Sequence, residues 1–335
     1  MTALANAARP RIRPLERAAS VQREYPIAQI VALVILFLVG ATTISGFTSS
    51  FSLRAMLVLA ALLGISTVGQ TVCLIIGGID VSIAGWVLGG AAVTATLLGG
   101  TGVRWTTWEV FLFLAVCAIV IGGLTGYICY RFEVPSLVVT LAVGAMIQGG
   151  VLAWSPQGSG IPPVWLGKAT SPATKTFGLG IPPVVFIWAA VAIGAYVVLQ
   201  RSVVGPWVHA SGSNLRAAKL ALLPTRWVWV GAFALSALAA TTAGVLLSGF
   251  SAGGDASIGT PYLWNGLTAV LIGGTAFGRQ GDYTRTVIGT LLVVVLSQVM
   301  TGYGLSYADQ NMLFGGLIVV IVSLYSRERR LRDQI

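Results

Sequence analysis

The feature that most limits how this chain can fold is a series of long apolar segments that carry almost no charge. Between residues 55 and 103 the only charged side chain is Asp80. A helix needs about 20 mostly apolar residues to cross a bilayer, so this stretch alone can hold two spans. Apolar residues make up 56% of the whole chain and charged residues only 9%. The chain is therefore predicted to be an all-α integral membrane protein.

About ten transmembrane helices are predicted from these segments. They cover residues 27–47, two spans within 55–103 broken near the Gly77-Gly78 pair, 108–130, 134–154, 183–200, 227–250, 264–277, 286–303 and 311–325. The segment 264–277 is short enough to be a half-helix or a tilted span. Prolines exclude a helix interior between residues 155 and 182, so this region is predicted to be an external loop with a short amphipathic piece near Trp165.

The basic residues predict the orientation of the spans. Ten spans place both termini on one side, and a cytoplasmic location for both puts 16 of the 20 Lys and Arg residues inside. The four outside are Arg54, Arg104, Lys168 and Lys175. We therefore predict a basic cytoplasmic tail over residues 1–26, a membrane domain over 27–326 and a second cytoplasmic tail over 327–335.

Several functional classes lack their required residues. The sequence has no G-x-x-x-x-G-K-[ST] phosphate loop, its only histidine is His209, and Cys73, Cys117 and Cys129 are scattered in apolar runs. We predict no catalytic site, no metal site and no cofactor bound by this chain. The net charge of +10 comes from connectors and chain ends, without a basic stripe among aromatics, which argues against nucleic-acid binding.

Asp80 has two interpretations. An acid at membrane depth suggests a function by default, here a place in the permeation path or the binding of a coupling proton. In the other interpretation Gly77 and Gly78 end one helix, and Asp80 or Ser82 accepts the free N–H groups of the next. The consecutive order of these residues favours the structural role.

A polar connector over residues 210–224 joins the sixth and seventh predicted spans. Asn214 suits the N-cap of a short helix over 215–223, which Pro224 closes. The apolar residues of this helix fall on one face, with Arg216 and Lys219 elsewhere. Such a helix either lies among lipid headgroups or docks a cytoplasmic partner, and these physical arguments leave both possibilities open.

Three motifs bear on this choice. They are Gly77-Gly78-Ile79-Asp80-Val81-Ser82, Gly212-Ser213-Asn214-x-x-Ala217-Ala218, and Ile272-Gly273-Gly274-Thr275 followed by Gly278-Arg279-x-Gly281. In order and spacing they resemble the GGIDLS, GxNxxAA and IGGxxxxGGxG segments of permease subunits in ribose-type sugar importers of the ATP-binding cassette class. The resemblance covers about residues 28–325. It departs from the family in the segment after Lys219, residues 220–226, where a Gly-Ile pair is usual, and in Gly278-Arg279-Gln280-Gly281, where one glycine is replaced.

The resemblance implies a type II importer-like permease in the bacterial inner membrane, carrying a pentose or hexose. It implies a second permease subunit, identical or different, and a periplasmic sugar-binding protein. It also implies cytoplasmic ATPase subunits that use Mg-ATP. The connector then becomes the coupling helix that contacts the ATPase. The implied coupling residues are Ser211, Gly212, Asn214, Arg216, Ala217, Ala218, Lys219 and Leu220.

Polar uncharged and aromatic residues within the spans are candidates for the translocation pathway, because sugars bind amides, hydroxyls and aromatic faces. The candidates are Gln70, Thr71, Thr140, Gln148, Phe250, Trp264, Asn265, Thr268, Gln298 and Asn311. Most polar side chains within spans simply bridge neighbouring helices, so only a minority of this set is expected to line the path.

Other possibilities stay open. A branched-chain amino acid permease of the same superfamily is the first, although the GGID motif favours sugar. An ion-coupled carrier would require more acids within the membrane, and an intramembrane enzyme would require a catalytic set. The echo between Ile76-Gly77-Gly78 and Ile272-Gly273-Gly274 suggests an internal two-fold repeat, as many transporters have.

Overall fold

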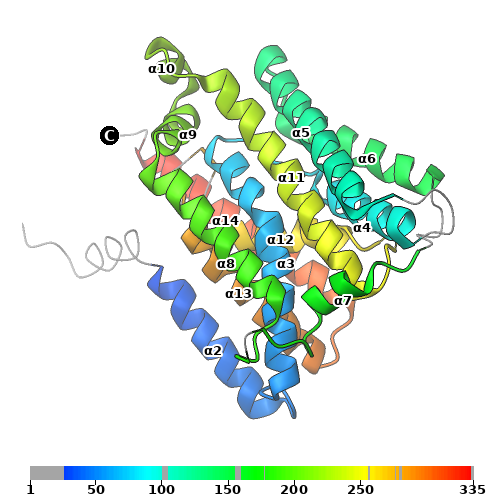
Figure 1. Cartoon of the computed structure of the whole chain (residues 1–335). Helices are drawn as coiled ribbons and strands as arrows, with labels where there is room; N and C mark the ends of the chain where they lie inside the picture. Colours follow the sequence, from blue (N-terminus) through cyan, green and yellow to red (C-terminus); the bar gives the residue numbers. More distant parts are fainter. Residues whose placement is uncertain are drawn as a thin grey trace, which may run out of the picture.

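A computed structural model describes residues 26–99, 105–154, 160–176, 178–255, 257–275, 277–278 and 281–332, and the side chains up to residue 323. Within these ranges the regular structure is helical (Figure 1). The helices are α2 (Ile27–Thr43), α3 (Ser50–Ile75), α4 (Ile83–Gly99), α5 (Thr107–Phe132), α6 (Ser136–Trp154), α7 (Val164–Thr170), α8 (Pro183–Tyr196), α9 (Val204–Ser213), α10 (Leu215–Leu220), α11 (Thr225–Ser251), α12 (Thr260–Ile272), α13 (Tyr283–Gly302) and α14 (Tyr307–Arg332). A π-helical turn over Val197–Arg201 extends α8.

Every predicted span coincides with a helix, and the all-helical fold class is confirmed. Six helices are long and apolar enough to cross a membrane: α3, α5, α6, α8 with its extension, α11 and α13. Three shorter apolar helices, α2, α4 and the first part of α14, accompany them. Helix α12 is only 13 residues long, so it has the length of a half-helix. Ten crossings and the cytoplasmic location of both termini stay predictions.

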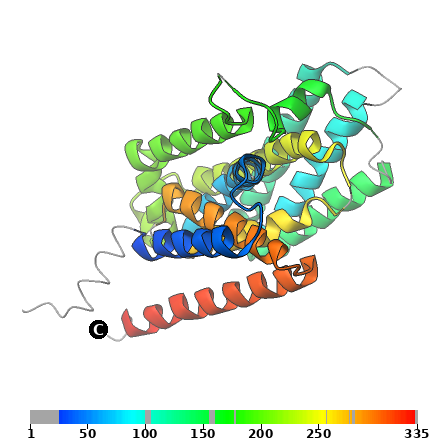
Figure 2. The ribbon, with the colours of Figure 1, turned by 90° about the horizontal axis from the view of Figure 1, so that it is seen from below.

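The centre of the bundle is formed by α3 and α11 (Figure 1). In α3, 94% of the most apolar stretch is buried inside the protein. In α8 with its extension, only 17% of the corresponding stretch is buried. A helix that is apolar on all sides requires apolar surroundings on all sides, and protein provides them for α3. The apolar outer faces of α5, α6 and α8 suit lipid. Figure 2 shows α14 along one edge of the bundle, where it packs on α12.

Glycines permit the closest helix crossings. A Cβ atom added at Gly90 of α4 would lie 2.3 Å from the carbonyl oxygen of Thr241, and one at Gly244 of α11 would lie 2.1 Å from that of Val87. Gly126 of α5 meets α11 in the same way. Small residues at such crossings let two backbones touch, which is how helices associate where the solvent itself is apolar. These contacts fix α4 and α5 against α11.

The prediction for residues 210–224 is wrong in one respect, because a single helix over 215–223 is not formed. Helix α9 runs to Ser213, Asn214 separates it from α10, and α10 ends after six residues at Leu220. Leu222 has a φ of 57°, a left-handed conformation that a helix cannot continue through. The expected N-cap is present, since the Asn214 side chain accepts a hydrogen bond from the Ala217 N–H at 3.0 Å.

Candidate functional site

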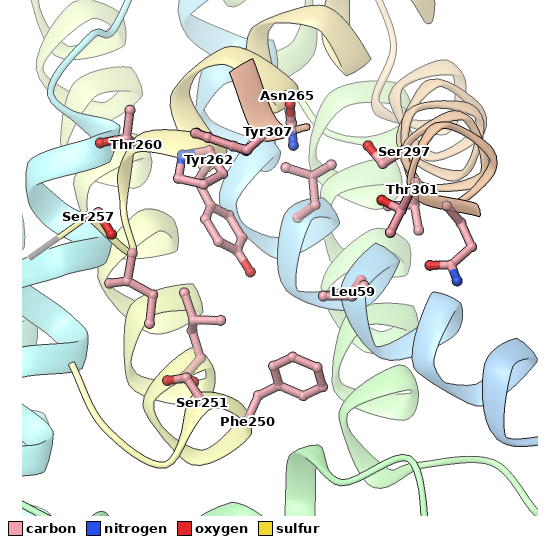
Figure 3. Close-up of a pocket in the computed structure, with 16 residues that line it drawn as sticks. Leu59, Phe250, Ser251, Ser257, Thr260, Tyr262, Asn265, Ser297, Thr301 and Tyr307 are labelled. Atoms are coloured by element: carbon pink, nitrogen blue, oxygen red, sulfur yellow. The ribbon is translucent and has the colours of Figure 1, made fainter. Parts of the chain in front are cut away.

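A cavity of about 620 Å³ opens between helices at one end of the bundle (Figure 3). Its walls come from α3, the end of α11, the start of α12, α13 and the start of α14. Phe250 and Ser251 belong to the last turn of α11, whereas the first residue of α11, Thr225, adjoins α10. With a rise of 1.5 Å per residue, the cavity and α10 are separated by about 40 Å of helix. In the predicted orientation, the cavity faces outward.

The cavity wall combines apolar residues with uncharged polar ones. The polar and aromatic lining residues are Phe250, Ser251, Ser257, Thr260, Tyr262, Asn265, Ser297, Gln298, Thr301 and Tyr307. Figure 3 shows Asn265 projecting from α12 and Ser297 and Thr301 projecting from α13. No charged side chain is among the lining residues, all of which belong to the described part of the chain. The site therefore suits an uncharged solute.

Some of these polar groups are already paired. The Ser257 hydroxyl donates to Asp255 Oδ1 at 2.6 Å, and the Thr301 hydroxyl accepts from Gln310 Nε2 at 3.1 Å. The amides of Asn265 and Gln298 make no hydrogen bond within the described ranges and are half-exposed to the cavity. Each of these amides can therefore offer both a donor and an acceptor to a ligand.

Asp255 gives the edge of the cavity a negative charge. The side-chain and backbone hydrogen bonds from Ser257 hold the pKa of the Asp255 carboxyl below its ordinary value. The carboxylate therefore stays ionised over the neutral pH range, just beyond the lining residue Ser257. An anionic solute would be repelled there, whereas an uncharged one would not.

The structure brings three of the predicted pathway residues into this cavity, namely Phe250, Asn265 and Gln298. Their hydroxyl-bearing neighbours were not predicted from the sequence. Ser297 and Thr301 lie on the same face of α13 as Gln298 and Val294, at the i, i+3, i+4 and i+7 spacing of a helix. That spacing is visible in the sequence and could have extended the prediction from Gln298 to its neighbours.

The other candidates lie outside the cavity. Gln148 on α6 and Trp264 on α12 are exposed on the outer surface. Gln70 is fully buried in α3, and Asn311 is half-buried near the start of α14. Two threonines are engaged within the bundle: the Thr71 hydroxyl pairs with Thr286 at 3.0 Å, and the Thr268 hydroxyl donates to a carbonyl of its own helix. A role in the pathway stays a prediction for all of them.

The break between α3 and α4 is held by side chains rather than by the helices themselves. Oδ1 of the buried Asp80 accepts from the Ser82 N–H at 2.9 Å and from the Ser82 hydroxyl at 2.5 Å. From α6, Ser136 accepts the N–H of Ile79, and Thr140 accepts the N–H of Val81. These bonds satisfy backbone groups that a helix break leaves free. The geometry matches the structural interpretation of Asp80.

The two glycine motifs close their helices in the same way. After α3, Gly77 has a φ of 85° and the next N–H bonds to the Cys73 carbonyl at 2.8 Å. After α12, Gly274 has a φ of 102° and the next N–H bonds to the Val270 carbonyl at 3.2 Å. Both are helix ends of the Schellman type. Gly77 therefore corresponds to Gly274, one position away from the match that the sequence echo suggested.

The three family motifs meet at the end of α3. The Gly278 N–H donates to the Leu74 carbonyl at 3.0 Å, which attaches the third motif to α3 just before the first motif. Gly212, in the second motif, lies so close that an added Cβ would be 1.8 Å from the Ile75 carbonyl oxygen. Three segments that are far apart in the sequence thus share one joint.

His209 joins α9 to the same region. Its Nε2 lies 3.1 Å from the Gly281 carbonyl oxygen, and its Nδ1 lies 2.8 Å from that of Gly205. The single histidine of the chain therefore links the helix before α10 to the segment between α12 and α13. A displacement of α9 would act directly on this segment and on the end of α3.

The predicted coupling residues divide into two groups. Ser211 and Ala218 are buried and Gly212 is packed on α3, so these three hold α9 and α10 in place. The exposed members are Asn214, Arg216, Ala217, Lys219 and Leu220. Leu220 is 86% exposed, and Leu222, which sequence analysis did not include, is 91% exposed.

Helix α10 is also attached to α5. Lys219 Nζ lies 4.8 Å from the centre of the Tyr130 ring and 4.0 Å from a carboxylate oxygen of Glu133. The Tyr130 hydroxyl in turn pairs with Thr225 at the start of α11. The long helices α5 and α11 therefore share one end with α10, whose Leu220 faces solvent.

The described part of the chain is a helical membrane bundle with an uncharged cavity between its helices, an arrangement that suits a membrane permease. A family model described as "Branched-chain amino acid transport system / permease component" matches residues 52–323. The chain belongs to this family, whose members are transport components, and it is a permease of the ATP-binding cassette class.

Curated relatives include the ribose import permease protein RbsC of Escherichia coli strain K12, which is 24% identical over 90% of this chain and 93% of that protein. The inner membrane ABC transporter permease protein YjfF of the same strain is 27% identical over 84% of this chain and 85% of that protein. The autoinducer 2 import system permease protein LsrD of Escherichia coli O9:H4 strain HS is 26% identical over 78% and 79%. No solved structure matches the chain.

Proposed function

We propose that this chain is one permease subunit of an ATP-driven importer for an uncharged, hydroxyl-rich solute of the monosaccharide class. The observation that carries the proposal is the outer cavity, in which the amides of Asn265 and Gln298 and the ring of Phe250 share an uncharged wall. Amides and hydroxyls match the hydroxyl groups of a sugar, and aromatic faces match its C–H surface. A relative named for ribose import supports the same substrate class.

A branched-chain amino acid is the second candidate, favoured by the family description. A free amino acid carries a carboxylate and an ammonium group, and each requires a charged or strongly hydrogen-bonding partner when it leaves water. The lining residues of the cavity offer no charged side chain for either group. A sugar is therefore favoured over an amino acid as the substrate.

Different partners are expected to bind at the two ends of the bundle. A binding protein would deliver the solute to the cavity, and a second permease subunit would complete the pathway. ATPase subunits, which use Mg-ATP, would bind the exposed part of α10 and the turn after it through apolar side chains such as Leu220 and Leu222. ATP-driven closure of the ATPases would then move α9 and α10. The pathway would open to one side of the membrane at a time, and this alternating access would carry the solute inward.

Reconstitution in proteoliposomes tests this function. The chain is combined with an ATPase and a binding protein identified by their binding to it, and uptake of labelled ribose, other monosaccharides and leucine is measured with and without ATP. We expect ATP-dependent uptake of a monosaccharide. Uptake of leucine alone would favour the second candidate, and uptake without an ATPase would establish an ion-coupled carrier instead.

The proposed contact between α10 and the ATPase is tested by Ala217→Glu. This variant puts a charge on the exposed face of α10 without filling a buried position. We expect loss of ATPase binding in a pull-down, with normal membrane insertion. Ala173→Glu is the matched control, since Ala173 is also exposed but lies in the loop after α7, on the far side of the bundle. If the ATPase bound equally well to both variants, the assignment of α10 would be wrong.

A further inference from the structure

Four polar side chains occupy two turns of α3 just beneath the cavity. Ser66, Thr67, Gln70 and Thr71 are each at most 1% exposed. All three hydroxyls donate to a carbonyl of the preceding turn of their own helix. A hydroxyl can satisfy itself in this way, so the burial of these three residues requires no further explanation.

Gln70 is different from its neighbours. Both its Oε1 and its Nε2 are buried, and neither atom has a hydrogen-bond partner among the residues that the structure describes. Burying an amide without a partner costs roughly 2–7 kcal/mol, depending on the reference state. A leucine would fill the same space without that cost, so the packing of this conformation does not explain an amide here.

The position of Gln70 along α3 connects it to the cavity. Leu63 lines the cavity, and Gln70 follows it by seven residues, which places both on one face with Gln70 about 10 Å deeper. One turn beyond Gln70, Leu74 packs on Leu267 and Leu271 of α12. Along α3, Gln70 therefore lies between the floor of the cavity and the apolar contact of α3 with α12.

We propose that Gln70 is a substrate-binding residue of the inner half of the pathway, which the separation of α12 from α3 exposes to the passing solute. The inference rests on the proposed function. An amide offers one acceptor and two donors without charge, so it suits a solute with several hydroxyl groups. While α12 packs on α3, the Gln70 amide is unpaired. When α12 separates from α3, the solute supplies the hydrogen-bond partners of the amide.

Gln70→Leu separates a binding role from a structural one. If Gln70 only supported the fold, its replacement would lower the unfolding temperature of the purified permease. Under the proposal, the unfolding temperature stays the same or rises, ATPase binding persists, and the rate of uptake falls by about tenfold or more, the factor expected for lost hydrogen bonds. Gln70→Asn, which keeps the amide, is expected to recover part of the uptake.

Thr94→Val is the matched control, because Thr94 is also fully buried with an unpaired hydroxyl but belongs to α4, which contributes no residue to the cavity wall. It should leave uptake unchanged. Wild-type uptake by the Gln70→Leu variant would overturn the inference, and so would a loss of uptake that accompanies a lower unfolding temperature. A wild-type chain that imports nothing with its partners would instead refute the function on which the inference depends.

Discussion

At the scale of single residues, Asp80 shows how an acid can be kept inside an apolar bundle. Its carboxylate shapes the turn that ends at Ser82, and α6 supplies the remaining partners of this break. Sequence analysis reduced the role of Asp80 to two interpretations, since the order of the residues identifies a helix break. It could not predict that Ser136 and Thr140 complete the break, because their contribution depends on how α6 packs.

Asp80→Asn should keep uptake at the wild-type level throughout the neutral pH range, since asparagine retains the oxygen that accepts from Ser82. Asp80→Leu leaves the Ser82 N–H and hydroxyl unpaired and should destabilise the protein by about 1–3 kcal/mol. Uptake assays over a series of pH values, with thermal unfolding of both variants, check these expectations. A loss of uptake in Asp80→Asn at unchanged stability would instead support the interpretation that Asp80 binds a coupling proton.

At the scale of helices, small residues decide which pairs approach closely. Helix α11 is packed against α4 through Gly90 and Gly244 and against α5 through Gly126. Apolar runs in the sequence identified these helices, but each run is apolar all round and so carries little information about its neighbours. The connector before α11 was misjudged for a related reason, since the left-handed Leu222 that ends α10 has no signal in a pattern of apolar residues.

Gly90→Ala should destabilise the bundle by about 1–3 kcal/mol, because the new methyl group meets the backbone of α11 rather than a side chain that could move. Gly149→Ala is the control on exposed α6, where nothing lies within 4 Å of the added atom. It should be neutral or stabilising by up to about 1 kcal/mol. Thermal unfolding in detergent measures both, and equal unfolding temperatures for the two variants would contradict the packing argument.

At the scale of the whole molecule, the two ends of the bundle differ in chemistry. One end has the uncharged cavity. The other end has α10, the exposed Leu220 and Leu222 in and just after it, and the joint of the three motifs. The long helices α3 and α11 run between the ends, so a motion of α10 can reach the cavity through elements that are rigid along their length. This arrangement is what an importer driven from one side of the membrane requires.

The orientation is tested with reporter fusions. Green fluorescent protein fused after Arg332 should be fluorescent and alkaline phosphatase fused there should be inactive, because both ends are predicted to be cytoplasmic. A phosphatase inserted after Lys175, in the loop before α8, should be active. Active phosphatase at the C-terminal position would refute the predicted cytoplasmic location of the C-terminus.

The sequence by itself determined that the chain is a helical membrane protein, where its helices lie and to which class of transporter it belongs. These properties are local, since an apolar run or a short motif is complete within consecutive residues. Only the tertiary structure decided that Asn265 and Gln298 face one cavity while Gln148 and Trp264 do not, and that residues near positions 77, 212 and 278 meet at one joint. Such meetings depend on helix rotation and crossing, which are set by contacts between residues far apart in the chain.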